Sequence, residues 1–122
     1  MTGVMAGGST KMEPPKDVTP PDGYEVVLHK DALTPGEVTE VIIGGTAIAI
    51  CNIEGTYSAL TNCCPVDAGC PLGEGEVVDK ALRCAYHGWL FDPVTGRSLT
   101  NPDVTIPVYS VLLKDEAVCV KL

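Results

Sequence analysis

Short runs of β-branched, aliphatic and aromatic residues, each closed by a turn signal, follow one another from residue 24 to the end of the chain. The separating turns use residues that favour tight reversals, such as Gly44-Gly45 and Glu54-Gly55. No segment carries the apolar repeat of an amphipathic helix. We therefore expect an all-β domain of mainly antiparallel strands. The predicted strands are 24–29, 38–43, 47–53, 57–62, 76–78, 81–84, 89–91, 106–113 and 117–122.

Residues 1–22 differ from the rest of the chain in composition. They combine Gly7-Gly8, Pro14-Pro15 and Pro20-Pro21 with scattered charges, and they show no periodicity that would bury one face. We expect a disordered leader here, followed by one domain over residues 23–122. A chain of 122 residues has room for one such core but not for an additional large catalytic domain.

The balance of charges limits the partners that the chain is expected to bind. A formal net charge of −8 disfavours nucleic acid and anionic membrane surfaces and favours a partner with a basic face. No apolar run reaches the length of a membrane span, and the first residues lack the pattern of a signal peptide. We therefore expect a cytoplasmic protein with neither a nucleic-acid nor a membrane partner.

The six cysteines fall into two groups. Cys51 and Cys119 lie in apolar, strand-like runs, where cysteine usually acts as a small core residue. The other four lie in or beside two candidate loops, and they are Cys63, Cys64, Cys70 and Cys84. In a cytoplasmic chain such clustering indicates metal binding rather than a disulfide framework.

The segment 84–92 carries the strongest chemical signal. Cys84 and His87 are three residues apart at a predicted hairpin tip, where Gly88 favours a turn. A soft thiolate and a neutral imidazole are both good ligands for iron and zinc. We expect the rings of Tyr86, Trp89 and Phe91 to shield a metal group at this tip, together with Pro71 at the other loop, and Trp89 and Phe91 to serve the core as well.

From about Tyr24 onward the chain resembles the small Rieske-type ferredoxins of aromatic-ring dioxygenase systems. Their pattern is C-x-H, then about fifteen to seventeen residues, then C-x-x-H, which supplies two cysteines and two histidines to a [2Fe–2S] cluster. Cys84 and His87 match the second half, and segments 57–60, 71–75 and 91–96 match its surroundings. The resemblance implies an all-β Rieske fold, with antiparallel sheets in a sandwich and a small cluster-binding subdomain of two hairpin loops.

The upstream loop, residues 63–72, departs from that pattern because it contains no histidine. Aligned from its left end, Cys64 is the cysteine and Val66 takes the histidine position. Aligned from Pro71, Asp67 takes that position, and sixteen residues then separate Asp67 from Cys84.

Three interpretations of the site remain open. In the first, a [2Fe–2S] cluster binds to Cys64, Cys84 and His87, with Asp67 or alternatively Cys70 as the fourth ligand. In the second, the cluster is lost and the domain is a binding module, similar to ligand-poor small subunits of nitrite reductases. In the third, Cys64, Cys70, Cys84 and His87 hold a tetrahedral metal such as zinc.

The resemblance implies one-electron transfer between a reductase and a terminal oxygenase or other oxidoreductase. The acidic residues Glu74, Glu76 and Asp79 flank the first loop and suit a basic partner face. We find no nucleophile–base pair, and we expect His29, at the end of the first predicted strand, to be a surface residue. The chain is therefore expected to be an electron-carrier component rather than a stand-alone enzyme.

Overall fold

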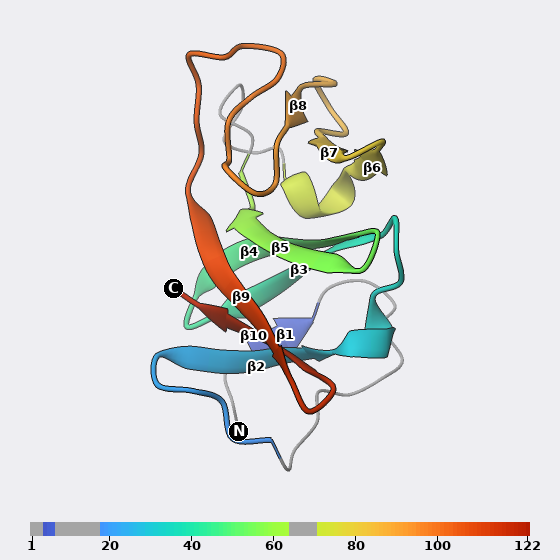
Figure 1. The fold of residues 1–122 in the computed structure, drawn as a ribbon. Coiled ribbons are helices and arrows are strands. Elements are labelled where there is room, and N and C mark those ends of the chain that lie inside the picture. The colour runs from blue at the N-terminus through green and yellow to red at the C-terminus, as the bar shows by residue number, and fades with distance from the viewer. Residues whose placement is uncertain (1–3, 7–17, 64–70) are drawn as a thin grey trace.

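The computed structural model describes residues 4–6, 18–63 and 71–122, which form two antiparallel sheets (Figure 1). The larger sheet has the strand order β1-β3-β4-β5-β9-β10-β2. Its strands are β1 (Val4–Ala6), β2 (Tyr24–His29), β3 (Val38–Ile43), β4 (Thr46–Ile53), β5 (Thr56–Thr61), β9 (Val108–Lys114) and β10 (Ala117–Lys121). The smaller sheet contains β6 (Glu76–Val78), β7 (Ala81–Arg83) and β8 (Leu90–Phe91). Two short 3₁₀ turns, η1 (Lys30–Ala32) and η2 (Leu72–Glu74), complete the described elements.

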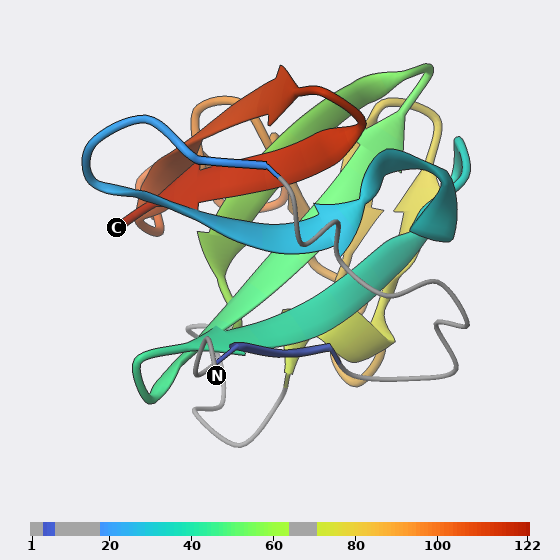
Figure 2. The same ribbon diagram turned by 90° about the horizontal axis from the view of Figure 1, so that it is seen from below.

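The larger sheet curls, so that β2 approaches β1 and β3 across its interior (Figure 2). Aliphatic side chains fill the space between these strands and form what we call the sheet core. Its buried members are Val27, Leu28, Leu33, Val41, Ile43, Ile48, Ile50, Ala59, Val118 and Val120. Burial of this apolar surface stabilises the curled sheet.

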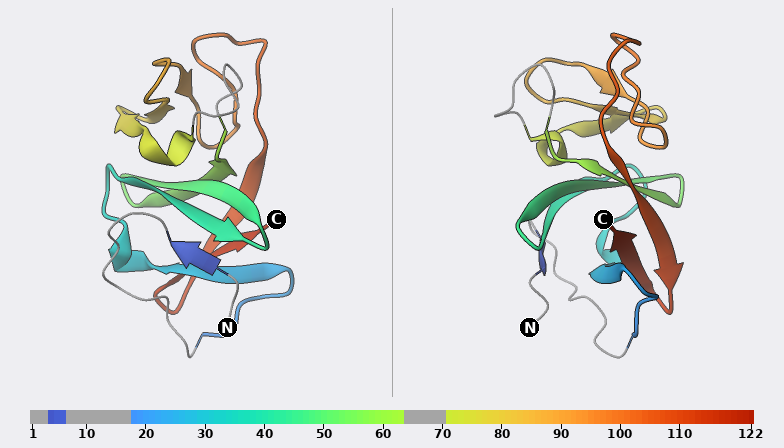
Figure 3. Two further views of the ribbon diagram at one scale, coloured as in Figure 1. Left: turned by 180° about the vertical axis from the view of Figure 1, so that it is seen from behind. Right: turned by 90° about the vertical axis from the view of Figure 1, so that its left-hand side faces the viewer.

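The smaller sheet stacks on the outer face of β4 and β5 (Figure 3). A second cluster of buried side chains, here called the site core, joins the two layers. It contains Ala49, Cys51, Leu60, Leu72, Leu82, Cys84, Phe91 and Ile106. Strand β4 is thus covered on both faces, which explains why its central residues are apolar without alternation.

The all-β fold predicted from the sequence is confirmed, and each predicted strand is present with small shifts of its ends. Strand β9 begins at Val108 instead of Ile106, because Pro107 has no N–H for the ladder. The Ile106 N–H instead donates to the Gly96 carbonyl at 2.9 Å.

The amino-terminal segment contains one element that the sequence did not indicate. Strand β1 lies inside the segment 1–22 predicted to be a disordered leader, and it pairs antiparallel with β3. Backbone pairing at a sheet edge needs little side-chain periodicity, so three residues suffice. The domain boundary at residue 23 remains a prediction. No helix among the described residues is long and apolar enough to cross a membrane.

Candidate metal centre

The tip between β7 and β8 brings the Cys84 thiol and the His87 imidazole together. Cys84 N–H donates to the Trp89 carbonyl at 2.8 Å, and Gly88 N–H donates to the Cys84 carbonyl at 3.0 Å. Gly88 has φ +71°, a left-handed conformation that glycine adopts without steric cost. The Cys84 Sγ and His87 Nδ1 atoms lie 3.9 Å apart. The local turn therefore places two metal-binding atoms side by side, as the spacing predicts.

The two side chains differ in their exposure to solvent. Cys84 is fully buried within the site core, whereas His87 is exposed. A metal group held by this pair would lie at the molecular surface, with protein on the thiolate side and solvent on the imidazole side. This donor pair fits half of a [2Fe–2S] site with mixed cysteine and histidine ligation.

The other predicted ligands, Cys64, Asp67 and Cys70, fall in residues 64–70, outside the described part of the chain. Within residues 18–63 and 71–122, no group of three or more His, Cys, Asp or Glu side chains is placed to hold a metal ion. The half-buried Cys63 leads into this segment from the end of β5.

The aromatic residues of the tip occupy three different environments. Phe91 is fully buried in the site core, and half-buried Trp89 packs against that core. Their ring centroids are 6.3 Å apart, with the ring planes tilted by 37°. Tyr86 is 62% exposed. Of these three rings, Phe91 thus supports the hairpin from beneath, whereas Trp89 and Tyr86 are accessible to solvent, and the expected shielding of a bound group stays a prediction.

Asn62 fixes the base of the upstream loop, a role that the sequence analysis missed. Its side chain is nearly buried; the Oδ1 atom accepts from Gly73 N–H at 2.5 Å, and the Nδ2 atom donates to Glu40 Oε2. A Cβ atom at Gly73 would lie 2.9 Å from the Glu40 Cβ, so the approach requires glycine. Both ends of segment 63–72 are therefore tied to β3. The sequence signal that could have indicated this role of Asn62 is its position at a strand end, directly before Cys63-Cys64-Pro65.

Cys51 and Cys119 are core thiols, as predicted. Both are fully buried, and burial raises the pKa of Cys51 to about 12 and also raises the pKa of Cys119. His29 ends β2, where its Nδ1 atom accepts from the Asp31 N–H at 3.0 Å. The Oε2 atom of Glu116 lies 3.9 Å from the Nε2 atom of His29. None of these residues joins the Cys84 and His87 pair.

The three acidic residues proposed to flank the first loop lie at different places in the fold. Glu76 pairs with Arg83 at 3.0 Å, next to Cys84. Asp79 lies at the turn between β6 and β7, which is the opposite end of the same hairpin. Glu74 ends η2.

Comparison with known proteins decides the family. Residues 23–110 match the Rieske [2Fe–2S] domain. The chain belongs to the Rieske [2Fe–2S] domain family. A [2Fe–2S] cluster is therefore its cofactor, and Cys84 and His87 are its described residues that fit such a cluster. A curated relative, the ferredoxin component of the naphthalene 1,2-dioxygenase system of Pseudomonas aeruginosa, is 30% identical over 71% of this chain and 84% of its own length.

Solved structures of other proteins share the fold. A protein of Mycobacterium tuberculosis described as an NADH-dependent nitrite reductase small subunit superposes with a TM-score of 0.76 at 22% identity, covering 81% of this chain and 94% of its own. A chain in the complex of reduced oxygenase and oxidized ferredoxin of carbazole 1,9a-dioxygenase superposes with a TM-score of 0.73 at 22% identity. The match covers 83% of this chain and 94% of that chain. The chain spans only 20% of the length of a larger relative, the cholesterol 7-desaturase of Caenorhabditis elegans, at 26% identity over 67% of this chain.

Proposed function

We propose that this Rieske protein is an electron carrier that links a reductase to a terminal oxygenase or other oxidoreductase. The observation that carries the proposal is the placement of the Cys84 Sγ and His87 Nδ1 atoms 3.9 Å apart at an exposed hairpin tip. The cluster supplies one-electron transfer when bound. We propose Cys64, Cys84, His87 and Asp67 as its ligands, with Cys70 as the alternative to Asp67.

The chain's own residues perform two tasks at this site. The hydrogen bonds between Cys84 and the backbone of Gly88 and Trp89 hold the two donor atoms in register before any group binds. The site core beneath Cys84, built around fully buried Leu82 and Phe91, excludes water from the thiolate side. Exposed His87 keeps the other side accessible, and a short distance to a docked partner favours electron transfer.

The charge of the fourth ligand sets the expected reduction potential. Replacing a neutral imidazole by the carboxylate of Asp67 or the thiolate of Cys70 adds negative charge and favours the oxidised state. The potential is expected near roughly −400 mV rather than in the Rieske range of about −150 to +300 mV. In the variant Asp67→His, the potential should rise markedly if Asp67 is a ligand. An unaltered potential in this variant, with a large change in Cys70→Ser, assigns the role to Cys70.

An oxygenase and a reductase are the proposed partners. The ferredoxin component of the naphthalene 1,2-dioxygenase system is the relative that supports them, and it is matched over most of its length. The formal net charge of −8 suits docking on a basic partner face. We place the protein in the cytoplasm, because the clustering of Cys63, Cys64, Cys70 and Cys84 at two loops suits metal binding rather than a disulfide framework.

The deciding experiment is the measurement of iron and acid-labile sulfide per chain on anaerobically purified protein, with EPR after reduction by dithionite. About two irons and two sulfides with a reduced-state EPR signal support the proposal. Cys84→Ser and His87→Ala should lose or alter this signal. The matched controls Cys119→Ala and His29→Ala should keep it. Normal cluster content and an unchanged signal in Cys84→Ser would falsify the ligand assignment.

A second candidate function departs from the cofactor of the family: a binding module that keeps the Rieske scaffold without its cluster. It is favoured by the absence of histidine from residues 63–72 and by the fold likeness to the protein described as a nitrite reductase small subunit. A colourless, metal-free and well-folded protein would establish this module instead. One zinc ion per chain without sulfide would indicate the tetrahedral site on Cys64, Cys70, Cys84 and His87.

A further inference from the structure

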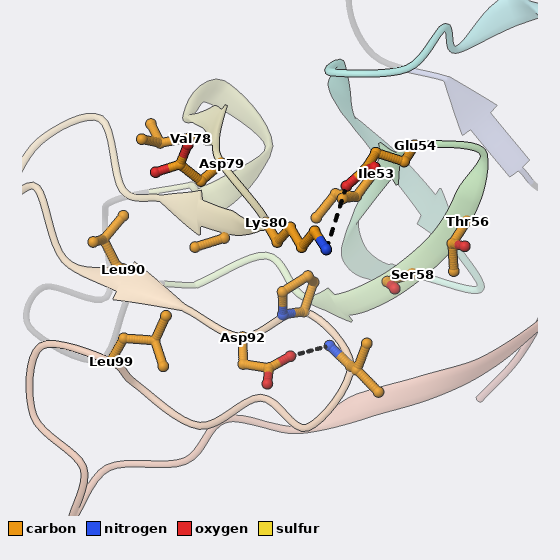
Figure 4. Close-up of a pocket in the computed structure, with 13 residues that line it drawn as sticks. Ile53, Glu54, Thr56, Ser58, Val78, Asp79, Lys80, Leu90, Asp92 and Leu99 are labelled. Atoms are coloured by element: carbon orange, nitrogen blue, oxygen red, sulfur yellow. Dashed lines mark hydrogen bonds and ion pairs between the residues drawn. The ribbon is translucent and has the colours of Figure 1, made fainter.

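A cleft of about 700 Å³ lies between the β4–β5 hairpin and the small sheet (Figure 4). Its walls come from the hairpin, from the β6–β7 turn and from the segment that follows β8. Residues that line it include Ile53, Ala81 and Pro93, and of these Ala81 and Pro93 are buried. The cleft is therefore a built feature of the interface between the two sheets.

Three aliphatic side chains that line this cleft are exposed to solvent. Val78 is 36% exposed, Val94 is 68% exposed and Leu99 is 55% exposed. They come from three separate segments of the chain. Single exposed apolar residues need no explanation, but convergence of several on one concavity marks an interaction site.

Acidic side chains surround this apolar surface. Glu54, Asp79 and Asp92 line the cleft together with one base, Lys80. The Lys80 Nζ atom lies 3.8 Å from the Glu54 Oε2 atom, and both side chains are more than 70% exposed. Asp92 Oδ1 accepts from the Val94 N–H at 2.8 Å, which fixes its carboxylate at the edge (Figure 4). The cleft therefore carries excess negative charge.

One of these acids, Glu54, occupies a backbone position that disfavours it. Glu54 and Asp79 both have φ of 54°, in the left-handed region. This region is costly for residues with a Cβ, and glutamate lacks the short side chain that lets asparagine adopt it more readily. The β9–β10 turn, which does not line the cleft, holds Asp115 and Glu116 in the same region. Glu54 thus occupies a turn position that glycine or asparagine would adopt with less strain.

The cleft does not include the Cys84 and His87 pair, because neither residue lines it. Strand β7 begins at Ala81, which lines the cleft, and Cys84 follows its last residue, three steps or roughly 10 Å along an extended strand. At its other side the cleft reaches Leu90, which pairs with Arg83, the residue before Cys84. A molecule bound in the cleft would therefore lie beside the hairpin tip without contacting its two donor atoms through the lining residues.

We propose that this cleft is a docking site for a segment of a partner protein in which an aliphatic side chain is flanked by lysine or arginine. The aliphatic side chain contacts Val78, Val94 and Leu99, and the basic side chains face the surrounding carboxylates. A second copy of this chain fits less well, because it would bring the same acids face to face. The site goes beyond electron transfer, since it would hold a partner through residues other than Cys84 and His87.

The test is an amide chemical-shift titration of the full-length protein with three synthetic heptapeptides. The first alternates lysine and leucine, the second alternates lysine and alanine, and the third alternates glutamate and leucine. We expect saturable shifts centred on Val78, Val94 and Leu99 with the first peptide alone, and weaker binding as salt is added. Binding of the second peptide with equal affinity, or shifts centred elsewhere, would overturn the proposal. Self-association of the protein without peptide would assign the cleft to a second copy and would overturn it as well.

Matched variants separate the two parts of the recognition. Leu99→Asp should weaken binding about tenfold or more, because it removes an apolar contact of leucine size. The control Leu113→Asp replaces a leucine of similar exposure outside the cleft, at 50%, and should bind as the parent does. Glu54→Asn relieves the left-handed strain but removes a carboxylate, so it should fold normally and bind about two- to fivefold less tightly at low salt. The control Glu25→Asn should leave affinity unchanged. Equal effects in a variant and its control would refute the assignment.

Discussion

Gly96 is a position where one added methyl group should damage the site core. Its φ is +80°, and a Cβ atom there would lie 2.1 Å from the Ile106 carbonyl oxygen and 3.0 Å from Val108 Cγ1. Gly96 also accepts a hydrogen bond from the Ile106 N–H at 2.9 Å. The obstacle is backbone rather than a flexible side chain, so the variant Gly96→Ala must shift the chain around Ile106.

The expected cost has two parts. Left-handed backbone costs an alanine about 1–2 kcal/mol. Displacing the Ile106 backbone weakens a buried hydrogen bond, worth about 1 kcal/mol, and loosens a side chain that packs in the site core, worth about 1–2 kcal/mol more. We expect Gly96→Ala to lower the free energy of unfolding by about 3–5 kcal/mol. Gly45→Ala is the matched control, because Gly45 has φ +86° and nothing within 4 Å of an added Cβ. It should lose only about 1–2 kcal/mol.

The assay is urea unfolding of both variants, followed by far-UV circular dichroism and by fluorescence of the single tryptophan, Trp89. Because Trp89 packs against the site core, its fluorescence reports on the layer that Gly96→Ala disturbs. Equal losses of stability in Gly96→Ala and Gly45→Ala would refute the reasoning, since they would show that the close approach to Ile106 costs nothing.

Three further outcomes follow from the described contacts. Asn62→Ala should lower the free energy of unfolding by about 1–3 kcal/mol. The control Asn101→Ala removes one local, exposed hydrogen bond from the Asp103 N–H at 3.3 Å and should lower it by less than about 1 kcal/mol, and equal urea midpoints would contradict the role of Asn62. Cys51 should resist maleimide at about pH 8 in the native protein and react in denaturant, as mass spectrometry would show, because burial raises its thiol pKa to about 12. The raised pKa of Cys51 also makes stability depend on pH: the stabilisation is complete below the unfolded pKa near 9.0 and is lost as the pH rises toward about 12. In Cys51→Ala, the urea midpoint should therefore fall less at alkaline pH than it does in the parent protein.

Local sequence signals were sufficient for the strands and for half of the site. Turn residues and alternating side chains act over a few positions, so they located β2 to β10 with small errors at the ends. The spacing of Cys84 and His87 acts within a single hairpin, and the structure places their donor atoms together. Cys51 and Cys119 were recognised as core thiols because their immediate neighbours are apolar.

Features that depend on distant segments were not visible in the sequence. Asn62 joins Glu40 and Gly73 across three elements, and nothing near residue 62 names those partners. Glu76 and Asp79 are close in sequence but lie at opposite ends of one hairpin, so the acidic surface expected beside the first loop divides into two places.

The chain's own pattern determined which residues form strands, which cysteines enter the core and which pair presents a thiol and an imidazole at a tip. These properties arise from interactions between residues a few positions apart. Only the tertiary structure decided that β4 is buried on both faces, that β1 pairs with β3, and that a cleft lined by Leu99 lies between the β4–β5 hairpin and the small sheet. The physical reason is that the burial of a residue depends on the apolar surface that all segments of the fold contribute together, and a short stretch of sequence does not show what the distant segments contribute.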